Sequence, residues 1–138
     1  MTNNKGRQDS SARGRVLFID DNEDTCEMVK LVLGQVGYEV AVGRSVMEGL
    51  RLVRAKRFDL ILLDMYFDDG NGLDLCRKVR EFDGATPIFF YTGMPQDQLL
   101  SAALEAGAQG CFIKPVEMDT LLQTLAAEIS TPGQGDGQ

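Results

Sequence analysis

Hydrophobic positions along the chain fall into two kinds of segment that alternate regularly. Five short segments are largely apolar, and three of them contain four apolar residues in succession, which is typical of strands covered on both faces. These strand-like segments are residues 15–20, 38–42, 58–64, 86–92 and 109–114.

The segments between these strands repeat apolar residues at helical spacing. Residues 24–37 end at Gly37, and glycine is common just past the end of a helix. Residues 45–57 open with Ser45, and Glu48 follows three residues later, as in a capping box. The other predicted helices are residues 72–82, 95–107 and 117–129.

A strand followed by a helix therefore occurs five times. This order predicts an α/β fold, a doubly wound five-stranded parallel sheet with five helices distributed over both faces. Ligands of such open sheets bind at the carboxyl ends of the strands. The residues that close each predicted strand are therefore the first candidates for a functional site.

Four of the five predicted strands end in a residue that can do chemistry. Asp20 and Asp21 close the first strand, Asp64 the third, Thr92 the fourth and Lys114 the fifth. Neighbouring carboxylates repel one another, and a hard divalent cation with oxygen ligands offsets that repulsion. We therefore predict a Mg2+ site at Asp20, Asp21 and Asp64, since an all-oxygen set suits Mg2+ better than zinc.

The same residues suit phosphoryl chemistry. A carboxylate can attack phosphorus to form an aspartyl phosphate, and a lysine and a metal ion can offset the charge of the phosphoryl oxygens. The Thr92 hydroxyl can donate a hydrogen bond to one of those oxygens. Taken singly, each residue has an ordinary explanation as a helix cap, a turn residue or a solvated charge; their joint placement favours a site.

Composition and charge narrow the function classes. The chain has 138 residues and a formal net charge of −7, which argues against nucleic acid or an anionic membrane as a partner. Three widely spaced cysteines predict neither a disulfide framework nor a zinc site and fit a reducing cytoplasm. The absence of histidine excludes a histidine metal site and a Ser-His-Asp triad.

The two ends of the chain differ from the region between them. Residues 1–14 and 131–138 are polar and rich in small residues, so we expect flexible tails around one domain over residues 15–130. The first residues lack the apolar stretch of a signal peptide, and the longest apolar runs are too short for a membrane span.

The motifs "IDD", "LILLD", "GLDL", "YTG" and "EAGAQGCFIKP" together closely resemble the receiver domain of bacterial two-component response regulators, the CheY-like family. The resemblance extends over residues 15–129. It implies the (βα)5 flavodoxin-like receiver fold with strand order 2-1-3-4-5. It also implies a regulatory phosphoacceptor domain, not an enzyme with its own substrate.

The resemblance assigns roles around the acidic site. Asp64 matches the phosphoacceptor, which takes its phosphoryl group from a histidine kinase or a histidine phosphotransfer protein. Asp21 and Asp64 match the direct Mg2+ ligands, and Asp20 acts mainly through water. The backbone carbonyl of Tyr66 matches a further metal ligand.

The resemblance also implies a switch. Thr92 and Lys114 match the residues that bind the phosphoryl group, and Phe112 is taken as the switch aromatic that moves when Thr92 is drawn inward. Pro115 stands where the family commonly has a cis peptide bond. An unknown output partner would then recognise the surface of the fourth helix, fifth strand and fifth helix.

One position departs from the family pattern, and two bulky residues are expected to affect the rate of dephosphorylation. Asp68 stands where the family usually has a proline, four residues after the phosphoacceptor, which leaves the stiffness of this loop in question. Tyr66 and Met94 are bulky and occupy positions that flank the approach of water to the phosphoryl group. We therefore predict slow self-dephosphorylation.

Three other readings stay open. A pseudo-receiver would bind proteins without being phosphorylated. An aspartate-nucleophile phosphatase needs a second aspartate two residues after the nucleophile, but Asn22 and Tyr66 stand at that distance from Asp20 and Asp64. A dinucleotide-binding domain lacks its G-x-G-x-x-G motif after the first strand. The sequence leaves undecided whether the receiver stands alone or belongs to a longer regulator.

Overall fold

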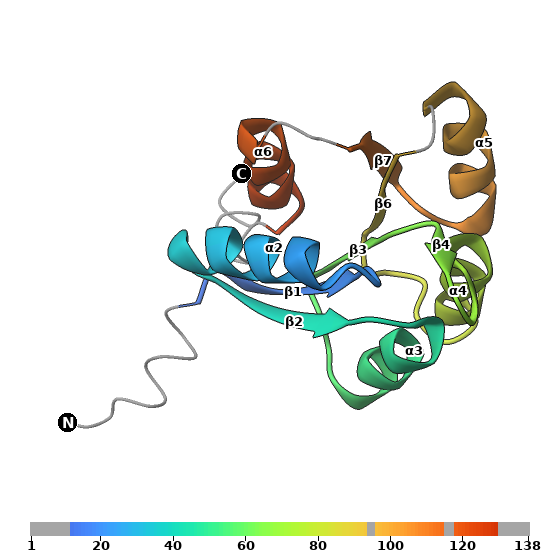
Figure 1. The fold of residues 1–138 in the computed structure, drawn as a ribbon, viewed down its shortest axis with the longest axis horizontal. Helices are drawn as coiled ribbons and strands as arrows, with labels where there is room; N and C mark the ends of the chain where they lie inside the picture. The colour runs from blue at the N-terminus through green and yellow to red at the C-terminus, as the bar shows by residue number, and fades with distance from the viewer. Residues whose placement is uncertain (1–11, 94–95, 115–117, 130–138) are drawn as a thin grey trace.

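A parallel sheet of five strands forms the centre of the computed structural model, which describes residues 12–93, 96–114 and 118–129 (Figure 1). From one edge to the other the strands are β2 (Tyr38–Gly43), β1 (Gly14–Ile19), β3 (Leu60–Leu63), β6 (Ile88–Thr92) and β7 (Gly110–Ile113). In chain order this is 2-1-3-4-5, so the predicted topology is confirmed.

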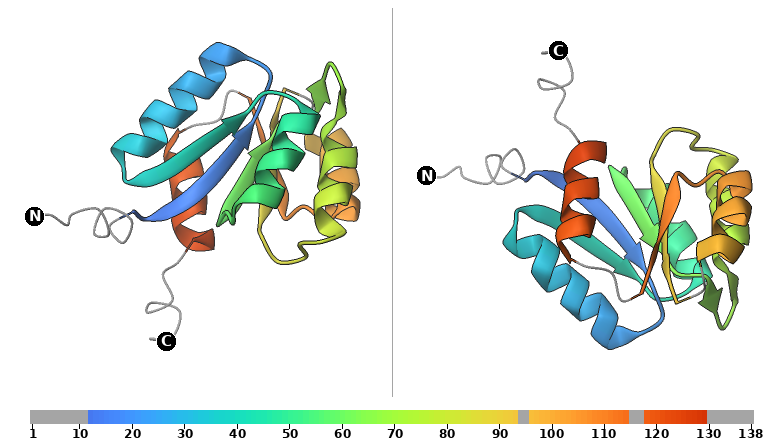
Figure 2. Two further views of the ribbon diagram at one scale, coloured as in Figure 1. Left: turned by 90° about the horizontal axis from the view of Figure 1, so that it is seen from below. Right: turned by 90° about the horizontal axis from the view of Figure 1, so that it is seen from above.

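The predicted helices are also confirmed, and they cover both faces of the sheet. They are α2 (Glu23–Gln35), α3 (Val46–Ala55), α4 (Gly72–Arg80), α5 (Gln96–Ala106) and α6 (Met118–Glu128). Figure 2 shows α2 and α6 on one face of the sheet and α3, α4 and α5 on the other. None of the described helices has the length and apolar character needed to cross a membrane.

Side chains of the central strands alternate between the two faces, as the pleat requires. Leu17 and Ile19 of β1 pack in the cluster beneath α3, α4 and α5, whereas Val16 and Phe18 pack in the cluster beneath α2 and α6. The central strands are therefore apolar on both sides, which explains their unbroken runs of hydrophobic residues.

Local signals fix the helix ends. The Ser45 hydroxyl accepts a hydrogen bond from the Glu48 N–H at 3.0 Å, as a helix N-cap does. The Glu48 carboxylate accepts from the Arg44 N–H at 2.7 Å, one residue earlier than in the standard capping box. Gly37 has a φ of +102°, a left-handed conformation that glycine adopts readily after a helix.

One small element was not predicted. Strands β4 (Tyr66–Phe67) and β5 (Gly70–Asn71) form an antiparallel hairpin between β3 and α4. Two residues per strand are too few to show a periodicity, so this hairpin left no pattern in the sequence. The predicted helix over 72–82 also ends two residues earlier, at Arg80.

Several predictions concern residues outside the described part of the chain. The proposed tails fall almost wholly within residues 1–11 and 130–138, and the cis peptide bond at Pro115 and the role of Met94 fall within residues 115–117 and 94–95. These remain predictions.

Candidate functional site

Three carboxylates meet at the carboxyl ends of the two central strands. Asp20 and Asp21 follow β1, and Asp64 follows β3. The strands lie side by side in register at Ile19 and Leu63, and the Asp64 N–H donates to the Ile19 carbonyl at 2.9 Å. One carboxylate oxygen from each aspartate lies within 4.8 Å of the other two. The convergence expected from the topology is present.

Asp20 is the buried member of the group, with 0% of its surface exposed. One of its carboxylate oxygens accepts a hydrogen bond from the Asn22 N–H at 2.9 Å. Its other oxygen accepts from the Lys114 ammonium at 2.7 Å. Both oxygens of Asp20 are thus engaged by the protein itself.

Lys114 connects the fifth strand to the two central ones. Its Nζ also lies 3.2 Å from Asp64 Oδ2, and it stands 5.2 Å from the centre of the Tyr91 ring. Burial by itself would lower the pKa of Lys114, but the hydrogen bonds and charges of Asp20 and Asp64 outweigh burial and raise that pKa. The lysine is therefore a permanent cation at neutral pH.

Hydrogen bonds fix the Asp64 carboxylate, and close packing fixes its backbone. Its Oδ1 accepts a hydrogen bond from the Met65 N–H at 2.7 Å, and its Oδ2 faces Lys114. The start of α4 packs so closely that a Cβ on Gly72 would overlap the Asp64 carbonyl oxygen. Only glycine fits there without a backbone shift, which fixes the segment that follows the carboxylate.

Asp21 and Tyr66 lie on the exposed side of the site. Asp21 is exposed, and no hydrogen bond to its carboxylate is recorded within the described ranges. Its backbone carbonyl accepts from the Arg44 guanidinium at 3.3 Å. Tyr66 is 62% exposed, on the first strand of the hairpin that follows Asp64. The role of its carbonyl stays a prediction.

Thr92 lies at the rim, but Phe112 does not lie beside it. Thr92 is 2% exposed and its carbonyl accepts from the Lys114 N–H at 2.8 Å. By strand alternation Thr92 shares the face of Phe90, beneath α3, α4 and α5. Phe112 packs on the opposite face, with its ring centre 5.5 Å from that of Phe89. From β7, Cys111 packs on the Thr92 face.

This placement counts against the switch predicted for Phe112. A side chain on the α2 and α6 face cannot fill space that Thr92 vacates on the other face without the strand turning over. The position two residues before Lys114 faces away from Thr92 because side chains alternate between the two faces along β7.

Three neighbours of the site were missed in the sequence. Asn22 caps α2 by accepting from the Thr25 N–H at 2.8 Å while its own N–H holds Asp20. Tyr91 lies against Lys114, and the Cys26 thiol donates to the Asp20 carbonyl at 3.1 Å. The Asn-x-x-Thr spacing before a helix was a readable signal for Asn22, whereas Tyr91 and Cys26 become neighbours only in the folded chain.

Cys26 is not a candidate nucleophile. Burial, reinforced by the charge of Asp20, raises the pKa of its thiol to about 11. The thiol therefore stays protonated at neutral pH and is a poor metal ligand. The reactive groups of the site are therefore the aspartate carboxylates and the Lys114 ammonium.

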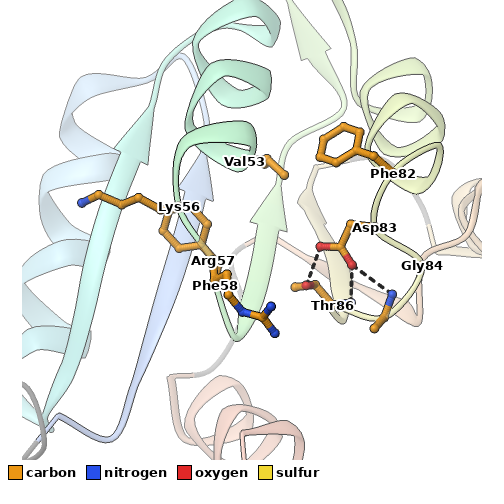
Figure 3. Close-up of a pocket in the computed structure, with 9 residues that line it drawn as sticks. Val53, Lys56, Arg57, Phe58, Phe82, Asp83, Gly84 and Thr86 are labelled. Carbon is orange, nitrogen blue, oxygen red and sulfur yellow. Dashed lines mark hydrogen bonds between the residues drawn. The ribbon is translucent and has the colours of Figure 1, made fainter.

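A separate cavity of about 360 Å³ lies at the opposite end of the strands, between the segments that lead into β3 and β6 (Figure 3). Its carboxylate, Asp83, accepts hydrogen bonds from the Ala85 and Thr86 N–H groups and from the Thr86 hydroxyl. Burial would raise the pKa of Asp83, but these hydrogen bonds lower it. Asp83 already accepts these hydrogen bonds from its own loop, so this cavity does not resemble the group of three carboxylates.

The donor chemistry of the acidic group fits a hard divalent cation. Three carboxylates within 4.8 Å of one another face one ammonium, which leaves two negative charges uncompensated. An all-oxygen donor set with excess negative charge suits Mg2+, whereas zinc sites usually include cysteine sulfur or histidine nitrogen.

Comparison with known proteins agrees with this geometry. A family model described as "Response regulator receiver domain" matches residues 16–126. The chain is 38% identical over 120 residues to the sensor histidine kinase AruS of Pseudomonas aeruginosa, using 84% of this chain and 12% of that protein. It is 31% identical over 118 residues to the response regulator protein PilR of the same organism, using 86% of this chain and 26% of that protein.

Solved structures match over nearly their whole length. A two-component response regulator from Clostridium difficile superposes with a TM-score of 0.81 at 28% identity, covering 85% of this chain and 96% of that one. The chemotaxis response regulator CheY4 of Vibrio cholerae gives a TM-score of 0.77 at 30% identity, covering 83% and 97%. The two curated relatives named are longer proteins, of which the chain spans only 12% and 26%.

Proposed function

The chain belongs to the response regulator receiver domain family, and on that premise we propose that Asp64 accepts a phosphoryl group in a phosphorelay. The observation that carries the proposal is the contact of Asp64 with Lys114 within the group of three carboxylates. A carboxylate used only as a helix cap would need neither the lysine nor the two acidic neighbours.

In the proposed reaction a carboxylate oxygen of Asp64 attacks the phosphorus of a phosphohistidine. A P–O bond forms, the P–N bond breaks, and the imidazole leaves with the electron pair and takes up a proton. Lys114 offsets charge on the phosphoryl oxygens, and the Met65 N–H holds the carboxylate. Attack by water on the acyl phosphate later releases inorganic phosphate and restores the carboxylate.

We propose Mg2+ as the cofactor, held by Asp21, Asp64 and the Tyr66 carbonyl, with Asp20 acting through water. When bound, the ion would neutralise developing charge on the transferred phosphoryl group. The exposed carboxylate of Asp21 has no hydrogen-bond or ion-pair partner among the described residues, and this supports its role as a direct ligand.

Receiver domains of response regulators interact with histidine kinases, and AruS, named above, is itself a sensor histidine kinase. We propose a histidine kinase or histidine phosphotransfer protein as the donor and the surface of α5, β7 and α6 as the face read by an output partner. Thr92 and Lys114, at the ends of β6 and β7, would connect that face to Asp64. Three free cysteines fit a cytoplasmic location.

The direct test is incubation of the purified chain with acetyl phosphate and Mg2+, followed by intact-mass measurement. We expect a gain of one phosphoryl group with Mg2+ and no gain with EDTA. A chain that folds and binds Mg2+ but never acquires the group would favour the pseudo-receiver. Continuous release of phosphate from many phosphate esters would favour a phosphatase.

Replacing Asp21 with asparagine is expected to stabilise the metal-free protein and to weaken its response to Mg2+. Removing one of three clustered negative charges relieves repulsion worth about 1 kcal/mol at an exposed position. The unmodified protein should gain about 2.7 kcal/mol at Mg2+ a hundredfold above its dissociation constant, and the variant much less. Thermal unfolding in EDTA and in Mg2+ measures both effects. Glu27→Gln, which removes an exposed carboxylate in the interior of α2, should change neither.

Replacing Tyr66 with asparagine, or Met94 with glutamate, is expected to shorten the lifetime of the aspartyl phosphate by at least about threefold, a barrier change under 1 kcal/mol. A smaller polar side chain opens the approach of water, and Tyr66 is 62% exposed beside the site. The decay of the phosphorylated mass after removal of the donor measures the lifetime. Phe82→Asn, at the far end of the sheet, is the control; unchanged decay in both site variants would remove the steric explanation.

A further inference from the structure

A carboxylate outside the acidic group holds the loop that follows Asp64. Asp69 lies at the turn of the β4–β5 hairpin, and its Oδ1 accepts from the Val46 N–H at 2.9 Å. Its Oδ2 accepts from the Met47 N–H at 3.0 Å. Val46 and Met47 are the first two residues of α3, more than twenty residues earlier in the chain.

These two N–H groups have no acceptor within α3, because the first turn of a helix leaves its donors unpaired. Ser45 already accepts from the third residue, Glu48. Asp69 thus completes the cap of α3 with a negative charge at the positive end of the helix dipole. The hydrogen bonds from Val46 and Met47 lower the pKa of Asp69, so the carboxylate is ionised throughout the neutral range.

The same hairpin is joined to the acidic site at its other end. The Gly72 N–H donates to the Met65 carbonyl at 2.7 Å, which closes the base of the loop. The Met65 N–H in turn holds Asp64 Oδ1 at 2.7 Å. Gly70, next to Asp69, has a φ of +154°, and a Cβ there would stand 3.2 Å from Val46 Cγ2. The hairpin is therefore fixed at its base to the Asp64 segment and at its tip to α3.

We infer that Asp69 is a positioning residue for the acidic site: it fixes the β4–β5 hairpin to α3 and so holds Met65 and Tyr66 in place beside Asp64. This inference rests on the proposed function, because the positioned groups are the amide that holds the phosphoacceptor and the carbonyl assigned to Mg2+. Without Asp69 the tip of the hairpin loses its two hydrogen bonds to α3. Tyr66 would then depend on the pairing of two strands of only two residues each.

The chain offers two matched controls. Asp68→Ala removes a neighbouring exposed carboxylate with the same change of charge, and no hydrogen bond of Asp68 is recorded among the described residues. Ser45→Ala removes the other side-chain cap of α3 and weakens the same helix end without touching the hairpin. A purely structural role of Asp69 would make Asp69→Ala behave like Ser45→Ala.

Two measurements test the inference. In the metal-free protein, hydrogen exchange of the Met65 and Gly72 amides should accelerate at least about tenfold in Asp69→Ala and stay within about twofold in both controls. The dissociation constant for Mg2+ should rise about tenfold in Asp69→Ala only, as for residues that orient metal ligands. Asp69→Asn keeps one oxygen acceptor. Its amide exchange rates and its dissociation constant for Mg2+ should therefore lie between those of the unmodified protein and those of Asp69→Ala.

The outcomes separate this inference from the proposed function. Equal exchange and equal Mg2+ affinity in Asp69→Ala and Ser45→Ala would overturn the positioning role while leaving phosphorylation of the unmodified chain intact. Failure of the unmodified chain to bind Mg2+ or accept a phosphoryl group would overturn the proposed function. In that case faster exchange at Met65 in Asp69→Ala alone would still show that Asp69 holds the loop, and unchanged exchange would reject it.

Discussion

Asp64→Asn is expected to abolish incorporation of the phosphoryl group, with the rate from acetyl phosphate and Mg2+ falling by at least about 100-fold, to background. An amide oxygen is a far weaker nucleophile than a carboxylate oxygen, while the shape of the side chain and its place beside Lys114 are kept. Intact-mass spectrometry over a time course measures the loss. A second measurement, cleavage of the adduct in the unmodified protein by hydroxylamine, identifies an acyl phosphate.

The control for this variant is Asp68→Asn, which makes the same chemical change four residues away in the same loop. It should be phosphorylated at the rate of the unmodified protein. Phosphorylation that persists in Asp64→Asn would mean that another carboxylate is the acceptor, such as Asp21, the exposed member of the same group. Such a result would contradict the central assignment of the site.

Lys114→Met is expected to lower the free energy of unfolding of the metal-free protein by about 2–3 kcal/mol. Removing one partner of a buried ion pair usually costs about 3–5 kcal/mol, and the 27% exposure of the Lys114 side chain lowers that figure. Methionine keeps the apolar stem but leaves the fully buried Asp20 without its cation. Urea denaturation in EDTA measures the change in the free energy of unfolding.

The pH dependence of this contribution follows from the raised pKa of Lys114. A group whose pKa is higher in the folded state stabilises the protein fully below its ordinary pKa and loses that effect as the pH rises through the raised value. The difference between Lys114→Met and the unmodified protein should therefore be constant across neutral pH and shrink only in strongly alkaline solution.

A double variant isolates the ion pair. Asp20→Asn combined with Lys114→Met should recover at least half of the lost stability, since no buried charge remains. Lys78→Met, an exposed lysine on α4 with no ion pair recorded among the described residues, should be neutral. A Lys114→Met protein as stable as the unmodified one in EDTA would show that Asp20 does not depend on this cation.

Asp68 stands where the family usually has a proline, so the sequence does not predict how stiff the loop after Asp64 is. The structure shows contacts that restrain the loop: the β4–β5 pairing, the Gly72 hydrogen bond to Met65 and the two hydrogen bonds of Asp69. A proline restrains one φ angle, whereas these contacts tie the loop to a helix that precedes it in the chain. The acidic character of the loop thus has a structural use in Asp69.

The alternation of strands and helices was readable because each element is long enough to show its period. β3 is apolar throughout and β1 is apolar from Val16 to Ile19, a pattern that a strand covered on both faces requires. Parallel strands place all their carboxyl ends on one edge of the sheet, so the topology alone predicts that Asp20, Asp21, Asp64 and Lys114 meet.

What the sequence by itself determined was thus the fold class, the strand order through the resemblance, and which residues share the acidic edge, because hydrophobic period and strand direction are local properties that add up along the chain. Only the tertiary structure decided that both oxygens of Asp20 are taken by Asn22 and Lys114, that Phe112 and Thr92 lie on opposite faces, and that Asp69 caps α3. Each of these depends on contacts across turns or between elements far apart in sequence. The pattern of residues along the chain does not give the distances between such groups.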